Sequence, residues 1–333
     1  MRLRNGLVFA LTVLVACAVL FGVWGCSSEK TATDEPAAET QNLTLFHAGS
    51  LAVPFKDISA AFNEKYPNVK VEAEAAGSRD TARKVSDLGR SCDVLGSADY
   101  KVVENLLMPD HADFNIRFST NELSIVYTDE SKYHDEITAD NWPEILLRDD
   151  VAFGRADPNR DPCGYRTVMV FQLAETYFKQ PGLAAKLADK DGDKFIRPKE
   201  TDLLALLESG EIDYLFIYRS VGMQHGLDIL RLSDEVNLKS PKFEELYNTA
   251  KIKVTGKKPG EFIERVGSAI VYSVTIPKNA ENREMAEAYL ELLLSPEGQK
   301  IMEKNGQSVI TPAVVDNYDN LPEALKQYCE QEQ

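Results

Sequence analysis

The chain has 333 residues, of which 53 are acidic and 37 basic, and its formal net charge is −16. A surface this acidic repels nucleic acid and anionic lipid, which argues against a nucleic-acid-binding function. It also repels a free anion at long range, so any anion that binds must be held by local geometry. The length is sufficient for two lobes of ordinary domain size.

The N-terminus has the pattern of an export signal. Arg2 and Arg4 precede an almost unbroken apolar run over 6–23, and the run ends in VWGC at 23–26. A basic start, a short apolar core and a small residue before the cleavage point are typical of a removable signal peptide. The segment 23–26 also resembles the lipobox of bacterial lipoproteins.

These features predict a signal peptide over 1–25, a lipid on Cys26 and a polar tether over 26–42. An N-terminal membrane anchor helix is the alternative, because the apolar run is long enough to span a bilayer. With either reading, the body of the protein is expected outside the cytoplasmic membrane and attached to it. With the signal removed, the formal charge falls to −18, because Arg2 and Arg4 are lost.

The cysteines do not form a recognisable framework. Cys17 is removed with the signal and Cys26 takes the lipid, which leaves Cys92, Cys163 and Cys329. An odd number of cysteines is not a disulfide framework, although one pair remains open. Their wide separation argues against a metal–thiolate site, and we expect neither a resident metal nor a cofactor.

Strand-like and helical runs alternate through the rest of the chain. We predict strands over 43–46, 69–75, 93–97, 122–127, 151–154, 213–218 and 269–276. We predict helices over 51–66, 79–88, 163–178, 201–208, 281–294 and 296–305. This alternation indicates an α/β protein with mainly parallel sheets covered by helices on both faces. Ligands of such proteins bind where strands end and helices begin.

Two strand-to-helix turns have residues suited to an oxyanion. AGS at 48–50 and AGS at 76–78 each follow a predicted strand. Gly49 permits close backbone approach, and we place Ser50 and then Ser78 at the N-caps. A hydroxyl and free N–H groups at a helix start attract an anion without any full charge. Ordinary helix capping is the alternative for either turn by itself.

A third turn lies in the segment 157–166, DPNRDPCGYR. Pro162 suits the first position of a helix and Asp161 suits the N-cap, so the N–H of Cys163 would be a donor without a helical partner. Asp161 is then either a capping residue alone or a carboxylate of the site. The second role requires a bound species with a cationic centre that accepts an extra oxygen.

Several segments together, in chain order, resemble the substrate-binding lipoproteins of tungstate/molybdate ABC transporters. The similarity is to the ModA/WtpA type and is strongest to the WtpA branch. It covers nearly the whole mature chain. The segments that carry it are 48–50, 76–78, SAD at 97–99, 157–165, GEIDY at 210–214 and IVYSVTIP at 270–277.

The resemblance implies a type II periplasmic-binding-protein fold, in which two lobes joined by a hinge close over the ligand. We expect lobe I to comprise 43–115 with about 290–333, and lobe II about 116–289. It also implies a function, which is the capture of tungstate or molybdate and its delivery to the permease and ATPase of an ABC transporter. A monomer without enzymatic activity is expected.

The resemblance also implies roles for individual residues. Ser50 and Ser78 match hydroxyl ligands of the family, and Tyr272 matches a tyrosine whose hydroxyl reaches an oxo group. Cys163 occupies the position of a backbone N–H donor. Asp161 occupies the position where the WtpA branch has a carboxylate that coordinates the metal.

One position departs from the family pattern. Ile217 lies where the WtpA branch usually has a glutamate, and isoleucine contributes at most its backbone N–H. A lone carboxylate beside a dianion is repulsive, so we favour Asp161 as an N-cap and a metal that stays four-coordinate. Six-coordination, the choice between tungstate and molybdate, another oxyanion such as sulfate or phosphate, and a sensor or enzyme with this fold remain alternatives.

Overall fold

The structure is a computed structural model that describes residues 40–190, 192–258 and 260–332. The predicted signal peptide and Cys26 lie outside the described residues, as does the predicted tether apart from 40–42. In the described part, no helix combines the length and apolar character needed to cross a membrane. The first strand begins at Gln41, so the predicted tether ends slightly earlier than expected.

The first sheet has seven strands within the described residues, in the order β14-β13-β4-β12-β3-β1-β2. Strand β1 is parallel to β2 and β3, whereas β4 and β12 pair antiparallel with each other. The strands are β1 (Gln41–Ala48), β2 (Val69–Ala76), β3 (Val94–Ser97), β4 (Ile116–Thr120), β12 (Val271–Thr275), β13 (Ser308–Val315) and β14 (Cys329–Gln331).

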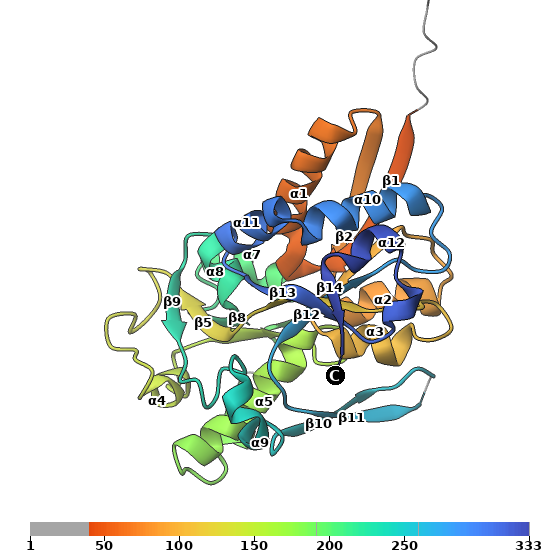
Figure 1. Cartoon of the computed structure of the whole chain (residues 1–333). Coiled ribbons are helices and arrows are strands. Elements are labelled where there is room, and N and C mark those ends of the chain that lie inside the picture. Colours follow the sequence, from red (N-terminus) through yellow and green to blue (C-terminus); the bar gives the residue numbers. More distant parts are fainter. Residues whose placement is uncertain (1–39, 191, 259, 333) are drawn as a thin grey trace, which may run out of the picture. The chain divides into compact units, whose positions relative to one another are not determined.

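Helices cover both faces of the first sheet (Figure 1). Side chains alternate between the faces of a strand, and on β1 Leu43 and Leu45 belong to one apolar cluster while Phe46 belongs to another. Helices α1 and α10 lie in the first cluster, where Phe62 meets Tyr289 at a ring distance of 5.4 Å. Helices α2 and α3 lie in the second. The helices are α1 (Ala52–Lys65), α2 (Ser78–Ser86), α3 (Tyr100–Leu106), α10 (Arg283–Leu294) and α11 (Pro296–Lys304).

The second sheet has the order β7-β6-β8-β5-β9. Its strands are β5 (Leu123–Tyr127), β6 (Phe153–Ala156), β7 (Ile196–Arg197), β8 (Tyr214–Tyr218) and β9 (Asp228–Arg231). Helix α5 (Pro162–Tyr177) packs on this sheet through aromatic side chains. Phe216 of β8 lies at the centre, with ring distances of 5.1 Å to Phe171 and 5.7 Å to both Trp142 and Phe153.

The other elements are short and connect or flank the sheets. Strands β10 (Lys251–Thr255) and β11 (Phe262–Val266) form a separate antiparallel hairpin. The remaining elements are η1 (Gly49–Leu51), α4 (Trp142–Leu146), α6 (Leu183–Asp189), η2 (Glu200–Leu203), α7 (Leu204–Glu208), α8 (Arg219–Gln224), η3 (Pro241–Phe243), α9 (Glu244–Tyr247), η4 (Tyr318–Asn320) and α12 (Glu323–Lys326).

The prediction of an α/β protein with two sheets flanked by helices is confirmed. The sheets are mixed rather than mainly parallel, because β4, β5 and β12 run antiparallel to their neighbours. The strand predicted over 151–154 lies two residues later, at β6. The helix predicted over 201–208 begins with the 3-10 turn η2 and continues as α7.

The predicted lobe boundaries need a correction at the level of the strands. Both β4 and β12 belong to the first sheet, although the prediction assigned them to lobe II. Each pairs along its length with strands of that sheet, and a strand cannot leave its ladder without losing those hydrogen bonds. The chain therefore leaves the first sheet after Thr120 and rejoins it at Val271. That the two sheets move as lobes about a hinge stays a prediction.

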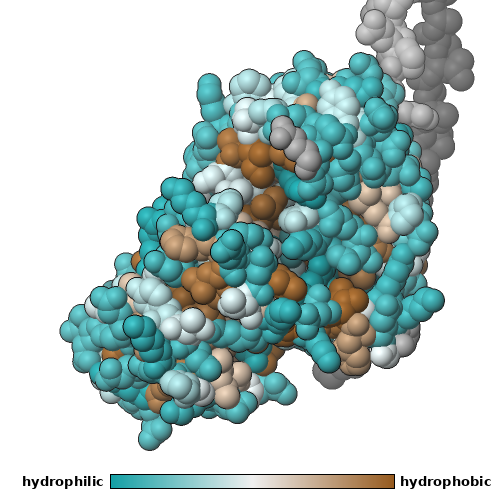
Figure 2. Space-filling view, turned by 60° about the horizontal axis from the view of Figure 1, so that its bottom comes forward, coloured by the Kyte–Doolittle hydropathy of each residue, from teal (hydrophilic) through white to brown (hydrophobic). Residues whose placement is uncertain are grey.

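The surface agrees with the acidic composition. Figure 2 shows a largely hydrophilic face with smaller apolar areas between the polar side chains. In the described part of the chain the exposed large apolar side chains are Leu88, Tyr177, Met223 and Phe262. Cys92, Cys163 and Cys329 are free and buried, so the pair that the sequence left open does not form.

Candidate functional site

The two serines in the AGS turns do not cap helices, and that part of the prediction is wrong. Ala48 is the N-cap of η1 and Gly77 is the N-cap of α2, and neither makes a side-chain capping bond. Ser50 and Ser78 lie one or two positions further on, inside the helical turns. A capping hydroxyl must come from the extended residue before the helix, so capping does not account for either serine.

Ser50 instead belongs to a buried cluster of hydroxyl groups. The Tyr272 hydroxyl of β12 donates to Ser50 Oγ at 2.9 Å. The amide of Asn121, in the connection from β4 to β5, donates to the Tyr272 oxygen at 3.1 Å and to Ser220 Oγ at 2.8 Å. Ser50 and Tyr272 are fully buried. The prediction placed both at the ligand, and the structure brings them into direct contact.

Helix α5 begins as the sequence predicts. Its first residue is Pro162, and Asp161 is the N-cap, whose Oδ1 accepts the Cys163 N–H at 2.8 Å. This confirms the capping role of Asp161. It also means that the Cys163 N–H, expected to be available to an anion, is bonded to the cap in this structure. The other oxygen, Asp161 Oδ2, accepts the backbone N–H of Glu200 at 3.2 Å.

Glu200 is a residue of this region that the sequence analysis did not identify. It is the first residue of η2, is only 1 % exposed, and neither of its carboxyl oxygens receives a hydrogen bond from a protein donor. A Cβ atom on Gly49 would lie 3.2 Å from both of these oxygens, so the carboxyl group faces the η1 turn. Glu200 therefore lies between the first turn, at Gly49, and the third turn, at Asp161.

The two carboxyl groups influence each other. Burial raises the pKa of Asp161 well above its usual range, and the charge of Glu200 and a hydrogen bond to its carboxyl group raise it further. When both groups are ionised they are acceptors only, so neither side chain can donate a hydrogen bond to the other.

Ile217 lies on β8 close to the same place. It is fully buried, and its carbonyl accepts the Ser124 hydroxyl at 3.1 Å. The carbonyl of the preceding residue, Phe216, lies 3.7 Å from the Cys163 sulfur. The position that lacks a glutamate is thus next to the start of α5, and its side chain supplies only apolar surface.

The second turn packs against the loop that precedes α5. The N–H groups of Arg79 and Asp80 donate to the Arg160 carbonyl at 3.1 and 3.4 Å. Arg160 also donates to Asp80 Oδ2 at 2.7 Å. A Cβ atom on Gly77 would lie under 3.0 Å from the Arg160 carbonyl, so only glycine fits there. These contacts join helix α2, which follows β2 of the first sheet, to the loop between β6 of the second sheet and helix α5.

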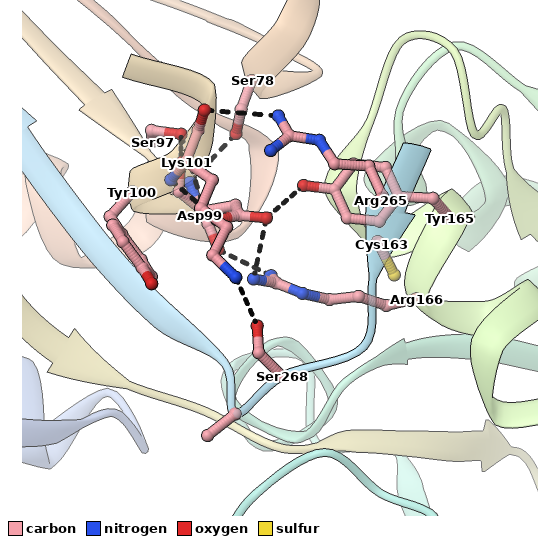
Figure 3. A network of polar contacts seen from close by, with 12 residues as sticks. Ser78, Ser97, Asp99, Tyr100, Lys101, Cys163, Tyr165, Arg166, Arg265 and Ser268 are labelled. Carbon is pink, nitrogen blue, oxygen red and sulfur yellow. Dashed lines mark hydrogen bonds and ion pairs between the residues drawn. The ribbon is translucent and has the colours of Figure 1, made fainter. Parts of the chain in front are cut away.

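A buried ionic network continues this junction (Figure 3). Arg166 of α5 donates to the Ala98 carbonyl at 2.6 Å and to the Tyr218 hydroxyl at 2.8 Å. Its guanidinium lies 3.4 Å from Asp99, the N-cap of α3, and Tyr165 also donates to Asp99. Burial raises the pKa of Asp99, but Arg166 and Arg265 outweigh that effect and hold it below the usual value.

Ser78 is linked to this network. The N–H of Ala98 donates to Ser78 Oγ at 2.9 Å, and the carbonyl of the same residue accepts from Arg166. The Tyr218 ring in turn lies 5.7 Å from that of Tyr272. Asp99 neutralises the charge of Arg166 within the network. The groups that surround Ser50, Ser78 and Tyr272 are mainly hydroxyls and carboxyls, and Arg166 offers them no unpaired positive charge.

His47 lies in β1, directly before the first turn. Its Nδ1 donates to the Ala48 carbonyl at 2.8 Å, and its ring lies 5.4 Å from Phe55. Burial lowers its pKa to about 4, so it is neutral at pH 7 and offers no charge to an anion. Within the described residues no group of three or more His, Cys, Asp and Glu side chains is arranged to hold a metal ion.

Comparison with known proteins places the chain in a family. Residues 43–307 match the model of the bacterial extracellular solute-binding proteins. The chain belongs to this family. Its members are binding proteins, which agrees with the prediction that this solute-binding protein is not an enzyme.

Two relatives cover most of the chain. An uncharacterized solute-binding protein of Petrotoga mobilis is 51 % identical over 289 residues, which cover 87 % of this chain and 90 % of the relative. The molybdate/tungstate-binding protein WtpA of Pyrococcus abyssi is 40 % identical over 339 residues, which cover 94 % and 96 %.

Solved structures with low sequence identity share the fold. The periplasmic molybdate-binding protein of Azotobacter vinelandii has a TM-score of 0.57 at 16 % identity, covering 80 % of this chain and 99 % of that one. The sulfate-binding protein SubI of Mycobacterium tuberculosis has a TM-score of 0.58 at 14 % identity, covering 81 % and 87 %. The predicted type II periplasmic-binding-protein fold is thereby confirmed.

Proposed function

We propose that this solute-binding protein captures tungstate or molybdate outside the cytoplasmic membrane and delivers it to the permease and ATPase of an ABC transporter. The 40 % identity to a protein named for binding molybdate and tungstate supports the ligand class. The observation that carries the proposal in the structure is the buried contact of Ser50 with Tyr272. These hydroxyls have no capping role that would explain them.

Burial of the site supports a mechanism of opening and closing. Ser50, Ser78 and Tyr272 are fully buried, and Asp161 is 2 % exposed, so a ligand reaches them only when the elements around them separate. On closing, hydroxyl groups replace the hydration shell of the oxyanion at low dielectric, where each hydrogen bond is stronger than in water. The absence of a full positive charge among these residues favours release to the permease.

Calorimetry with tungstate, molybdate, sulfate and phosphate tests the proposal. We expect tungstate and molybdate to bind and sulfate at equal concentration not to displace tungstate. Displacement by sulfate would instead indicate a sulfate-binding protein. Hydrolysis of an ester substrate, or a signalling partner in place of a permease, would indicate an enzyme or a sensor that reuses the fold.

Removal of one serine hydroxyl is expected to weaken tungstate binding. Ser50→Ala or Ser78→Ala deletes a hydrogen bond to a charged ligand, at a cost of ~1.5–3 kcal/mol, which is roughly tenfold to a hundredfold in affinity. Ser86→Ala is the matched control, because Ser86 ends the same helix as Ser78 and its hydroxyl donates to Asp87. Wild-type affinity in both site variants would show that these serines do not contact the ligand.

We also propose that Cys26 carries a lipid that attaches the protein to the membrane, as the sequence VWGC at 23–26 suggests. Cys26→Ser is then expected to leave the signal peptide uncleaved or to release the protein into the soluble fraction, because serine has no thiol to acylate. Fractionation and intact mass measure both. Tight membrane attachment with the signal removed would contradict lipidation at this residue.

A further inference from the structure

Glu200 is a buried ionisable group that has no partner in the polypeptide. It is 1 % exposed, and neither carboxyl oxygen receives a hydrogen bond from a protein donor. No ion pair between Glu200 and a lysine or arginine occurs among the residues that the structure describes. Burial of a carboxylate is unfavourable unless it is paired or hydrogen-bonded. A partner from outside the chain therefore accounts best for its position.

The carboxyl group points into the candidate site and not into an apolar core. Its oxygens face Gly49, and its own N–H is bonded to the Asp161 carboxyl. Burial raises the pKa of the Cys163 thiol and of the Tyr272 hydroxyl, and the negative charge of Glu200 raises both further. Glu200 is thus surrounded by the residues that the family resemblance assigned to the ligand.

We infer that Glu200 binds the metal centre of the oxyanion directly, together with Asp161. This inference rests on the proposed function and identifies a residue that discriminates between ligands. Each carboxylate donates one electron pair to the metal, and no metal–oxo bond breaks. The metal thus gains two oxygen ligands beyond its four oxo groups.

The chemistry of the ligands explains why such a pair selects among oxyanions. Molybdenum and tungsten are large, electropositive centres that accept additional hard oxygen donors. The sulfur of sulfate does not accept additional oxygen donors. Two acidic groups in the site therefore only repel the sulfate dianion. The acidic pair therefore favours tungstate and molybdate and disfavours sulfate.

This inference changes the expectation drawn from Ile217. The sequence suggested that the second carboxylate was lost and that the metal stays four-coordinate. The structure has a carboxylate in the same region, but on η2 instead of β8. We therefore expect a six-coordinate metal, with Glu200 in place of the missing side chain at 217.

The test compares Glu200→Gln with Asp202→Asn. Both variants remove one negative charge from η2, but Asp202 is more exposed and pairs with Lys199 at 3.2 Å. We expect Glu200→Gln to lower tungstate affinity by roughly tenfold to a hundredfold. The ratio of tungstate affinity to sulfate affinity should fall as well. Asp202→Asn should bind both anions as the wild type does. X-ray absorption should detect six light-atom neighbours in the wild type and fewer in Glu200→Gln.

The outcomes separate the two proposals. If the wild type binds neither tungstate nor molybdate, the proposed function is wrong. If it binds them, but Glu200→Gln binds tungstate as tightly or more tightly, or the wild-type metal is four-coordinate, then the assignment of Glu200 is wrong. Thermal unfolding of ligand-free Glu200→Gln should match or exceed that of the wild type, because the variant removes repulsion with Asp161. This result would exclude misfolding as the cause of lost binding.

Discussion

Gly77→Ala is expected to lower tungstate affinity by about fivefold to 150-fold while leaving the ligand-free protein nearly as stable as the wild type. The added methyl group would lie under 3.0 Å from the Arg160 carbonyl and 3.0 Å from that of Pro198. Relief of such an overlap costs roughly 1–3 kcal/mol. Helix α2 follows β2 of the first sheet, and the Arg160 loop follows β6 of the second. We therefore expect the overlap to arise only when the two predicted lobes close. Calorimetry and urea unfolding measure the two effects separately.

Gly164→Ala is the matched control for this prediction. A Cβ atom there would lie under 3.0 Å from the Ala156 carbonyl, but both residues belong to the β6–α5 unit. This overlap is present whether the site is open or closed, so Gly164→Ala should lower the free energy of unfolding of the ligand-free protein by roughly 1–3 kcal/mol. If Gly77→Ala lowers the free energy of unfolding as much as Gly164→Ala does, then α2 and the Arg160 loop do not separate when the ligand is absent.

Arg166→Met is expected to reduce tungstate affinity by roughly a hundredfold to a few thousandfold. Arg166 is 3 % exposed in the structure, and its removal leaves Asp99 buried without its main cation. Leaving one member of a buried ion pair unpaired costs ~3–5 kcal/mol. An open protein escapes this cost by hydrating Asp99, so the penalty appears in ligand affinity.

The double variant Arg166→Met/Asp99→Asn tests whether the unpaired Asp99 causes the loss of tungstate affinity. Asp99→Asn keeps an N-cap that accepts from Lys101 and removes the charge. Combined with Arg166→Met it should recover much of the lost affinity, because neither charge remains buried. Arg148→Met is the control, since Arg148 forms a more exposed pair with Glu136. A double variant no better than Arg166→Met would exclude Asp99 as the relevant partner.

Much of the fold followed from local patterns. Helix α5 was predicted within one residue of its bounds, because Asp161 and Pro162 mark its start. The hairpin of β10 and β11 was missed because both strands mix charged and apolar residues and are partly exposed. Strands β13 and β14 were also missed. The residues of β13 are largely exposed or only partly buried, and β14 is a three-residue strand at the edge of the sheet.

The site was predicted in part. Ser50, Tyr272 and Asp161 were identified from a family resemblance, and the structure places Ser50 against Tyr272 and Asp161 against Glu200. Glu200 itself was not found, because it lies 39 residues from Asp161 in the chain and looks there like an acidic residue of a surface turn. Asn121 gave no signal either. Its role depends on Tyr272, which is 151 residues away.

The topology of the first sheet has a consequence for the order of folding. Its strands come from both ends of the described chain, whereas the strands of the second sheet all lie between Leu123 and Arg231. The second sheet can therefore form from one continuous stretch, with the shorter loop closures that favour fast folding. The first sheet cannot be completed until β12, β13 and β14 are available. During synthesis, the second sheet can thus be complete while the first sheet still lacks its central strand, β12.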